Sequence, residues 1–203
     1  MSRRNSQPQP RQPREAYYTP GAAVRVLLES LPLFMLRRFE AWECAAGAGH
    51  IARHLARLPF AAVLATDIAP AKVQVHPVTP LDFLRSCGPS GRRCAIITNP
   101  PYGFQNRMAV SFITHALAIA GDRGGLTAML LPFEFDAPMS RHAMTHGHRA
   151  FAAKVTCGER LRWVNLPQAA AGPMSHHSWF IWCFDPALRR LIRDMNCGGM
   201  RTR

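Results

Sequence analysis

The chain has 203 residues, of which 48% are hydrophobic, and this size and composition fit one globular domain with a sizeable core. Its 25 Lys and Arg residues exceed its 12 Asp and Glu residues, so the net charge is +13, which favours a polyanionic partner such as nucleic acid. No apolar run is long enough to span a membrane, and Arg3 and Arg4 are followed by polar residues rather than a signal-peptide core. We therefore expect a cytoplasmic protein with no membrane partner.

The cysteines and histidines do not form a recognisable metal motif. None of the six cysteines belongs to a C-x-x-C pair, which argues against a structural zinc site and favours reduced, mostly buried thiols. His50 and His54 have the spacing of two ligands on one helix but lack the glutamate of an H-E-x-x-H motif. We expect no metal.

The N-terminal residues differ in composition from the rest of the chain. Residues 1–15 are rich in Arg, Pro and Gln and show no apolar periodicity, which predicts a disordered basic arm. Such an arm could contact phosphates or be a solvated tail without function. Residues 16–203 are expected to form a single domain.

The first chemical motif is a glycine turn between a strand and a helix. The segment Phe39–His50 contains Glu43-x-x-x-Gly47-x-Gly49, and the apolar residues that follow it have helical spacing. Glycines at these positions let the backbone approach a ligand closely at the carboxyl end of a strand. The third glycine of the dinucleotide fingerprint is absent because position 52 is Ala, and no Gly-Lys-Ser/Thr of a P-loop follows.

An acidic residue follows the next predicted strand. Asp67 stands near the end of the apolar segment Ala62–Ile68, about 20 residues beyond the turn, the spacing at which a carboxylate accepts hydrogen bonds from ribose hydroxyls. The glycine turn and Asp67 together predict a binding site for a nucleoside cofactor.

The most informative motif is Asn-Pro-Pro-Tyr at residues 99–102, directly after the predicted strand Cys94–Thr98. Proline restricts its own φ and the backbone of the residue before it, so this loop is stiff. Asn99 and Pro100 present two oxygen acceptors able to hold both hydrogens of one NH2 group, and the ring of Tyr102 could stack on a planar substrate. This arrangement suits methyl transfer to nitrogen, although Asn-Pro can also simply end a strand.

The rest of the chain continues as alternating helix and strand, followed by a basic helix. A mixed helical and loop region is expected over about residues 134–153, and the last two strands are expected to form an antiparallel hairpin. The remaining expected elements are a helix carrying Met108, Phe112, Ala116 and Ile119 on one face, strands at Leu126–Pro132, Leu161–Leu166 and Ser178–Phe184, and a helix at Ala187–Met195.

Taken in order, these motifs resemble the class I S-adenosylmethionine-dependent methyltransferases, and in particular the amino-group methyltransferases with an N-P-P-Y motif. The segment Tyr17–Pro20 and the apolar residues after it are similar to a segment that precedes the glycine motif in N6-adenine methyltransferases. The resemblance covers about residues 17–184. It implies an α/β fold with a doubly wound, mostly parallel, seven-stranded Rossmann-like sheet and an antiparallel last strand, with S-adenosyl-L-methionine as cofactor.

The resemblance also implies roles for individual residues. Tyr18, Thr19 and Pro20 would contact the methionine end of the cofactor, and Glu43, Gly47 and Gly49 would form the turn beneath it. Asp67 would hold the ribose, Asp82 would accept from the adenine amino group, and Phe83 would pack on the adenine ring. Asp82 could instead cap a helix, and Phe83 could be an ordinary core residue.

The catalytic and substrate-binding candidates come from the loop at residues 99–102, which we call the acceptor loop, and from a later segment. Asn99, Pro100 and Tyr102 are the predicted catalytic residues, and Pro101, Tyr102, Arg160, Arg162 and Trp163 are the predicted substrate-binding residues. The two arginines could contact phosphate and the tryptophan could stack on a base, but a tryptophan beside a predicted strand could equally be core.

We expect the acceptor to be an exocyclic amino nitrogen, with N6 of adenine in DNA as the first hypothesis and RNA as the second. One alternative is a protein methyltransferase acting on the N5 amide nitrogen of glutamine, because that amide presents the same NH2 group. Another is an inactive cofactor-fold module that binds nucleic acid through its charge. No length remains for a separate target-recognition domain, so sequence specificity would need the loops, a homodimer or a partner protein.

Overall fold

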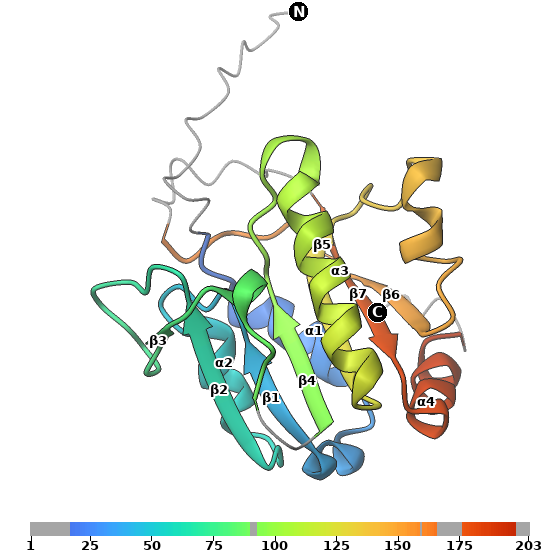
Figure 1. Cartoon of the computed structure of the whole chain (residues 1–203), viewed down its shortest axis with the longest axis horizontal. Coiled ribbons are helices and arrows are strands. Elements are labelled where there is room, and N and C mark those ends of the chain that lie inside the picture. The colour runs from blue at the N-terminus through green and yellow to red at the C-terminus, as the bar shows by residue number, and fades with distance from the viewer. Residues whose placement is uncertain (1–16, 90–92, 159, 166–175, 198–203) are drawn as a thin grey trace, which may run out of the picture.

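The strands of this protein form one mixed sheet, seen in a computed structural model that describes residues 17–89, 93–158, 160–165 and 176–197 (Figure 1). The seven strands lie in the order β3-β2-β1-β4-β5-β7-β6. They are β1 Phe39–Glu43, β2 Ala62–Asp67, β3 Thr79–Pro80, β4 Arg93–Thr98, β5 Leu126–Pro132, β6 Phe151–Thr156 and β7 His177–Cys183. The predicted arm at residues 1–15 lies outside the described residues.

All neighbouring strands from β3 through to β5 pair in parallel, whereas β7 is antiparallel to both β5 and β6. The predicted fold class, a mostly parallel seven-stranded sheet with an antiparallel last strand, is therefore confirmed. The central strands β4 and β5 are buried along nearly their whole length, as expected for strands covered on both faces.

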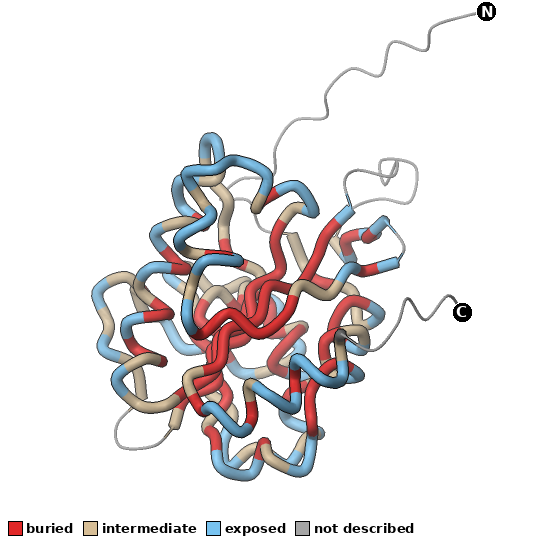
Figure 2. The backbone as a smooth tube through the Cα atoms, turned by 90° about the vertical axis from the view of Figure 1, so that its right-hand side faces the viewer, coloured by how far each residue is buried: buried red, intermediate tan, exposed pale blue. Residues whose placement is uncertain are grey.

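Helices cover both faces of the sheet. The α-helices are α1 Gly21–Glu29, α2 His50–Leu55, α3 Arg107–Asp122 and α4 Pro186–Cys197, and the 3-10 helices are η2 Leu33–Arg38, η3 Phe83–Arg85, η4 Phe104–Asn106 and η5 Met139–Met144. Residues from α1, α2 and α4 join one apolar cluster, and residues from α3 join a second cluster on the opposite face, where α3 crosses the sheet in Figure 1. The buried strands between the two layers form the centre of the molecule (Figure 2).

The order of the strands reverses between β1 and β4. From β1 the chain proceeds outward to β2 and β3, and then returns to place β4 on the other side of β1. In open α/β sheets, ligands bind outside the carboxyl ends of the strands at such a switch point. The ends of β1, β2 and β4 are where the three sequence motifs lie.

The predicted strand at Leu161–Leu166 is wrong over residues 161–165, and Leu166 lies outside the described residues. The first strand of the hairpin is Phe151–Thr156, part of which was expected to be loop. Leu161 and Trp163 alternate with exposed residues as in a strand, but β6 already occupies the sheet edge. The two side chains instead fill one end of the core from an irregular segment. The predicted last strand and final helix are confirmed within one or two residues at each end.

None of the helices in the described part of the chain is long and apolar enough to cross a membrane.

Candidate functional site

A cavity of about 520 Å³ lies at the carboxyl ends of β1, β2 and β4. Predicted site residues from all three sequence motifs line it, namely Tyr18, Thr19, Glu43, Gly47, Asp67, Asp82, Phe83, Asn99 and Pro101. The predicted site residues that do not line it are Pro20, Gly49, Pro100, Tyr102, Arg160, Arg162 and Trp163. The structure thus brings the glycine turn and the acceptor loop to one cavity, although they are about 50 residues apart in the sequence.

The glycine turn requires glycine at two positions. Gly47 and Gly49 have φ angles of 55° and 83°, in the left-handed region that residues with a Cβ rarely adopt. A Cβ on Gly49 would lie 2.8 Å from the backbone oxygen of His76, and one on Gly47 would lie 3.2 Å from the ring of Tyr18. Gly47 therefore lies at the cavity wall, whereas Gly49 allows the segment after β2 to pack against the turn.

The carboxylate of Asp67 holds this turn in place. One oxygen accepts from the N–H of Gly47 at 2.8 Å, and the other accepts from the N–H of Ala69 at 2.8 Å. These bonds use two of the roughly four acceptor positions of a carboxylate, so the group retains the capacity to accept from ligand hydroxyls. Asp67 also lines the cavity, and its predicted contact with a ribose stays a prediction.

Glu43 is a buried carboxyl at the end of β1, and its side chain accepts a 2.6 Å hydrogen bond from the N–H of Ala52 in α2. Burial and the nearby charge of Asp67 raise the pKa of Glu43 well above its ordinary value, and the backbone hydrogen bonds from Ala52 and Ile51 only partly oppose this. A carboxyl that is costly to ionise beside a cavity would be stabilised in its charged form by a cationic ligand.

The side of the cavity next to η3 combines an apolar surface with the carboxylate of Asp82. The Asp82 side chain accepts from the N–H of Leu84 at 3.1 Å and caps η3, while Asp82 also lines the cavity. Phe83 is only 2% exposed and packs with Trp42 and Phe112, but it lines the cavity as well. The structural and cofactor-binding interpretations of these two residues are therefore compatible.

The side-chain amide of Asn99 is oriented by two neighbours. Its Nδ2 donates to the carbonyl of Tyr17 at 3.3 Å, and the hydroxyl of Tyr102 lies 3.1 Å from its Oδ1. The same hydroxyl lies 3.2 Å from the carbonyl oxygen of Leu130, so its single hydrogen can serve either acceptor. Because a carbonyl can only accept, the contact with Tyr17 assigns the nitrogen and leaves Oδ1 as an acceptor.

The ring of Tyr102 packs against the apolar cluster beneath α3 and stacks with His177 at 6.1 Å between centroids, and it does not line the cavity. Its hydroxyl contacts Asn99. The predicted stacking of Tyr102 on a target base stays a prediction. Pro100 is buried, and the predicted acceptor role of its carbonyl stays a prediction.

Trp163 is 6% exposed and packs against Tyr17 and His177, as in the core interpretation of this residue, and its predicted stacking on a base stays a prediction. Its segment holds the residues that precede α1. The N–H of Val164 donates to the carbonyl of Tyr18 at 3.0 Å, and the N–H of Tyr18 donates to Oδ1 of Asn165 at 3.0 Å. The segment after β6 thus positions the cavity residue Tyr18, while Pro20 only precedes the first turn of α1.

Arg160 and Arg162 are exposed on this same segment, and neither lines the cavity. Arg160 lies with its Nε 3.4 Å from Nε2 of His176. Their predicted contacts with substrate phosphate stay predictions.

His50 and Met108 line the cavity but were not predicted to do so. The ring of His50 stacks on Tyr18 with the centroids 5.2 Å apart. Burial, with smaller contributions from the charges of Arg53 and His54, lowers the pKa of His50 below its ordinary value. The sequence could have indicated this position for His50, because His50 directly follows Gly49. The residue after such a glycine turn begins the helix next to the cavity.

In the described ranges, no group of three or more His, Cys, Asp or Glu residues is arranged so that it could hold a metal ion.

Comparison with known proteins identifies the fold. No family model and no curated protein matches the sequence. Among solved structures, the chain is similar to the 23S rRNA methyltransferase ErmE (18% identity, TM-score 0.52, covering 82% of this chain and 69% of that one). It is also similar to the methyltransferase subunit of a type I restriction-modification system from Streptococcus thermophilus (13% identity, TM-score 0.55, covering 82% and 44%).

A third similar structure is the 1,6-didemethyltoxoflavin-N1-methyltransferase of Burkholderia thailandensis, solved with S-adenosylhomocysteine (13% identity, TM-score 0.51, covering 80% of this chain and 78% of that one). At such low identities, these similarities establish the fold alone. The fold is that of the class I S-adenosylmethionine-dependent methyltransferases.

Proposed function

We propose that this protein transfers the methyl group of S-adenosyl-L-methionine to an exocyclic amino nitrogen of a base in nucleic acid, with N6 of adenine in DNA as the first target to test and RNA as the second. The observation that carries the proposal is the shared cavity of Asn99 with Gly47 and Asp67. A cofactor-binding turn and an acceptor of amine hydrogens meet there across the switch point of the sheet.

The residues present fit the cofactor. Asp67 would accept from the ribose hydroxyls. Asp82 would accept from the adenine amino group, while Phe83 and the other apolar residues around η3 would enclose the adenine ring. Glu43 and Thr19 would face the charged methionine portion. The cofactor supplies an electrophilic methyl group on a positively charged sulfur, so the protein's own contribution is alignment and electrostatic support.

Asn99 would hold the acceptor amine. Its Oδ1 has two lone pairs, so it can accept from the amine while it keeps the Tyr102 hydroxyl as a partner. Together with the Pro100 carbonyl, it would draw both amine hydrogens to one side and leave the nitrogen lone pair available. A neutral amide is no strong base, and we infer that the proton leaves to solvent after transfer.

The positive charge of the chain and the structural neighbours support nucleic acid as substrate. The net charge is +13, and the similar structures include an rRNA methyltransferase and a restriction-modification subunit. A base within a duplex would have to be extruded to reach Asn99. Arg160 and Arg162 are exposed near the Tyr18 side of the cavity and would contact the backbone of such a substrate.

The test is incubation of the full-length chain with methyl-labelled cofactor and separate pools of DNA, RNA and protein, followed by nucleoside and amino-acid analysis. We expect label in N6-methyladenine from nucleic acid. Label in glutamine of the protein pool would show the protein methyltransferase alternative. Cofactor binding without label in any pool would show an inactive cofactor-fold module.

A further inference from the structure

A second cavity, of about 440 Å³, lies between the start of α3 and η5. Its lining contains two arginines and a serine but no carboxylate, and consists of Gln105, Arg107, Val110, Ser140, Arg141 and Met144. Arg107 lines this cavity, and the next residue, Met108, lines the cofactor cavity. The two cavities are therefore neighbours on either side of the first turn of α3.

We propose that this second cavity binds a phosphodiester group of the polynucleotide substrate, beside the nucleotide whose base enters the cofactor cavity. The inference rests on the proposed function, because it takes the acceptor to be part of a nucleic acid. Guanidinium groups bind phosphate through paired N–H donors, and a serine hydroxyl adds a further donor.

Arg141 is already held in place for such a role. Its guanidinium donates to the carbonyls of Phe135 at 2.7 Å and Gln105 at 3.1 Å, and it lies 4.4 Å from the centroid of the Phe135 ring. These two bonds use two of its five N–H donors. A cation fixed before the ligand arrives loses little conformational entropy on binding.

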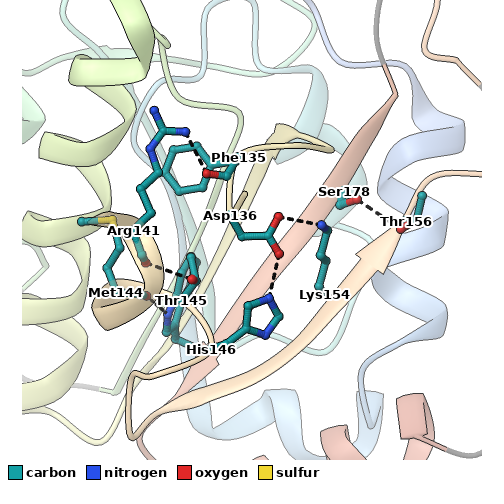
Figure 3. A network of polar contacts seen from close by, with 10 residues as sticks. Phe135, Asp136, Arg141, Met144, Thr145, His146, Lys154, Thr156 and Ser178 are labelled. Atoms are coloured by element: carbon teal, nitrogen blue, oxygen red, sulfur yellow. Dashed lines mark hydrogen bonds and ion pairs between the residues drawn. The ribbon is translucent and has the colours of Figure 1, made fainter. Parts of the chain in front are cut away.

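The segment that carries Arg141 is braced on the β6–β7 hairpin, as Figure 3 shows. Asp136 accepts from Lys154 of β6 and contacts His146, both at 2.7 Å. The indole of Trp182 in β7 donates to the carbonyl of Met144 at 2.7 Å. The wall of the second cavity formed by η5 is thereby tied to the sheet.

The opposite wall is a strained turn. Gln105 and Asn106 have φ angles of 53° and 62°, and they are the only residues other than glycine with positive φ in the described part of the chain. Backbone strain of this kind persists where the surroundings hold it, and it concentrates at functional sites. Here Arg141 binds the carbonyl of Gln105, and the carbonyl of Tyr102 accepts from the N–H groups of Met108 and Ala109. Hydrogen bonds therefore link the acceptor loop to the start of α3, and the turn before α3 to Arg141 in the second cavity.

The charges of this cavity are not neutralised by a neighbouring carboxylate. Among the described residues, Arg107 and Arg141 form no ion pair, a property that they share with other arginines of the chain, but these two line one cavity together. Arg107 is exposed and lies 6.0 Å from the centroid of the Phe104 ring. Two guanidinium groups in one cavity without a neutralising carboxylate favour an anionic ligand.

The test is the salt dependence of nucleic-acid binding by full-length protein. Fluorescence anisotropy with fluorescein-labelled 20-base-pair DNA and RNA duplexes of the same adenine-containing sequence would give dissociation constants between 50 and 200 mM salt. Arg107→Gln is the main variant, because the side chain of Arg107 is exposed. Arg107→Lys tests retention of charge, and Arg190→Gln on α4 is the matched control because its side chain is 86% exposed.

We expect Arg107→Gln to weaken binding about 5- to 10-fold and to lower the magnitude of the salt slope by about 0.9, the value for one lost phosphate contact on duplex DNA. Arg107→Lys should keep most of the slope, and Arg190→Gln should leave slope and affinity unchanged. Equal slopes for wild type and Arg107→Gln, or equal losses in Arg107→Gln and Arg190→Gln, would overturn the phosphate site.

The same experiment separates this inference from the proposed function. If the wild type methylates nucleic acid but Arg107→Gln binds it with an unchanged slope, only the phosphate site is wrong. If the wild type neither binds nor methylates nucleic acid, the proposed function fails and the phosphate site fails with it. Unchanged cofactor affinity of Arg107→Gln would show that this variant is folded.

Discussion

The cofactor side and the acceptor side of the cavity are built in different ways. On the cofactor side, β1, the glycine turn, α2 and β2 follow one another between Phe39 and Asp67, and the bond from Gly47 to Asp67 spans 20 residues. On the acceptor side, Asn99 is oriented by Tyr17, 82 residues away, and by Tyr102, whose ring stacks with His177 of the last strand. One side depends on a local motif, while the other depends on contacts that form only when distant segments pack together.

A substitution at Asn99 should change turnover strongly and cofactor binding hardly at all. Replacing Asn99 with Ala removes the predicted amine acceptor, so turnover should fall about 1,000-fold, in the range seen when one polar group aligned with a transition state is lost. The cofactor dissociation constant should change little, because Asn99 does not belong to the glycine turn. Single-turnover kinetics and calorimetry on the same preparation would measure both, and retained turnover would remove Asn99 from the catalytic machinery.

The next effect should lie on the cofactor side. Asp67→Ala removes the acceptor for the N–H groups of Gly47 and Ala69 as well as for the ribose, so cofactor affinity should fall about 100-fold, equivalent to about 2.7 kcal/mol. Asp67→Asn keeps one oxygen acceptor and should lose less. Calorimetric affinity equal to wild type in the Ala variant would exclude Asp67 from the site.

Glu43→Gln should affect the binding of two related ligands differently. S-adenosylmethionine carries a positively charged sulfur, whereas the sulfur of S-adenosylhomocysteine is neutral. The variant should lose about 10-fold in affinity for the first and about 2-fold for the second, as expected when one favourable charge interaction is removed. Equal losses for the two ligands would show that the carboxylate does not sense the sulfonium.

The raised pKa of Glu43 also predicts the sign of a stability difference. Burial, the main cause, makes the folded state hold the proton more tightly than the unfolded state, where the pKa is about 4.3. In the absence of cofactor, wild-type stability should therefore decline relative to Glu43→Gln as pH rises from about 4 toward the folded-state pKa. Urea unfolding of both proteins at several pH values would measure this, and a difference independent of pH would contradict it.

Tyr102 tests whether the acceptor side is positioned through the hydroxyl or through the ring. Tyr102→Phe removes the hydrogen bond toward Asn99 or Leu130, and should lower turnover about 3- to 10-fold, as for the loss of one ordinary hydrogen bond. Tyr102→Ala should additionally destabilise the fold, because the ring packs in an apolar cluster. Identical kinetics in Tyr102→Phe and wild type would show that the ring of Tyr102, rather than its hydroxyl, matters for turnover.

The last prediction concerns the stability of the segment between β5 and β6, which carries Asp136 and Arg141. Burial alone would raise the pKa of Asp136, but hydrogen bonds from Lys154 and His146 outweigh it, so the pKa lies below its ordinary value. The resulting stabilisation is present above the unfolded-state pKa of about 3.9 and is lost as pH falls through the folded-state pKa. Asp136→Asn should lower the free energy of unfolding by about 1 to 2 kcal/mol at neutral pH. The difference should vanish in acid, and a difference that persists there would contradict the account.

The contrast between the two sides also explains what the sequence could predict. The sequence predicts the strand, the glycine turn, the helix and the position of Asp67 at the end of the next strand correctly. These features depend on apolar periodicity and on glycine conformation, which are determined by a few neighbouring residues. The hairpin strand was misplaced at Leu161–Leu166, since Leu161 and Trp163 show strand alternation without a partner strand. Alternation of buried and exposed residues indicates which side chains face the core, but it does not indicate which segment forms the edge strand of the sheet.

Within the candidate site, the motif pointed to Asn99, which lines the cavity, but no sequence pattern pointed to its hydrogen-bond partners. The contact of Asn99 with Tyr17 joins segments that no local pattern connects, and the inward packing of Tyr102 depends on His177 in the last strand. Trp163 was ambiguous for the same reason, because its neighbours Tyr17 and His177 become adjacent only in the folded protein. Side-chain roles that depend on distant packing needed the structure.

The most direct test of the central claim is an experimental structure of the protein with S-adenosylhomocysteine bound. We expect the ribose hydroxyls to lie within hydrogen-bond distance of the Asp67 carboxylate and the thioether sulfur to face Asn99 across the cavity. A ligand bound away from Gly47 and Asp67, or a sulfur on the side of the cavity remote from Asn99, would contradict that claim.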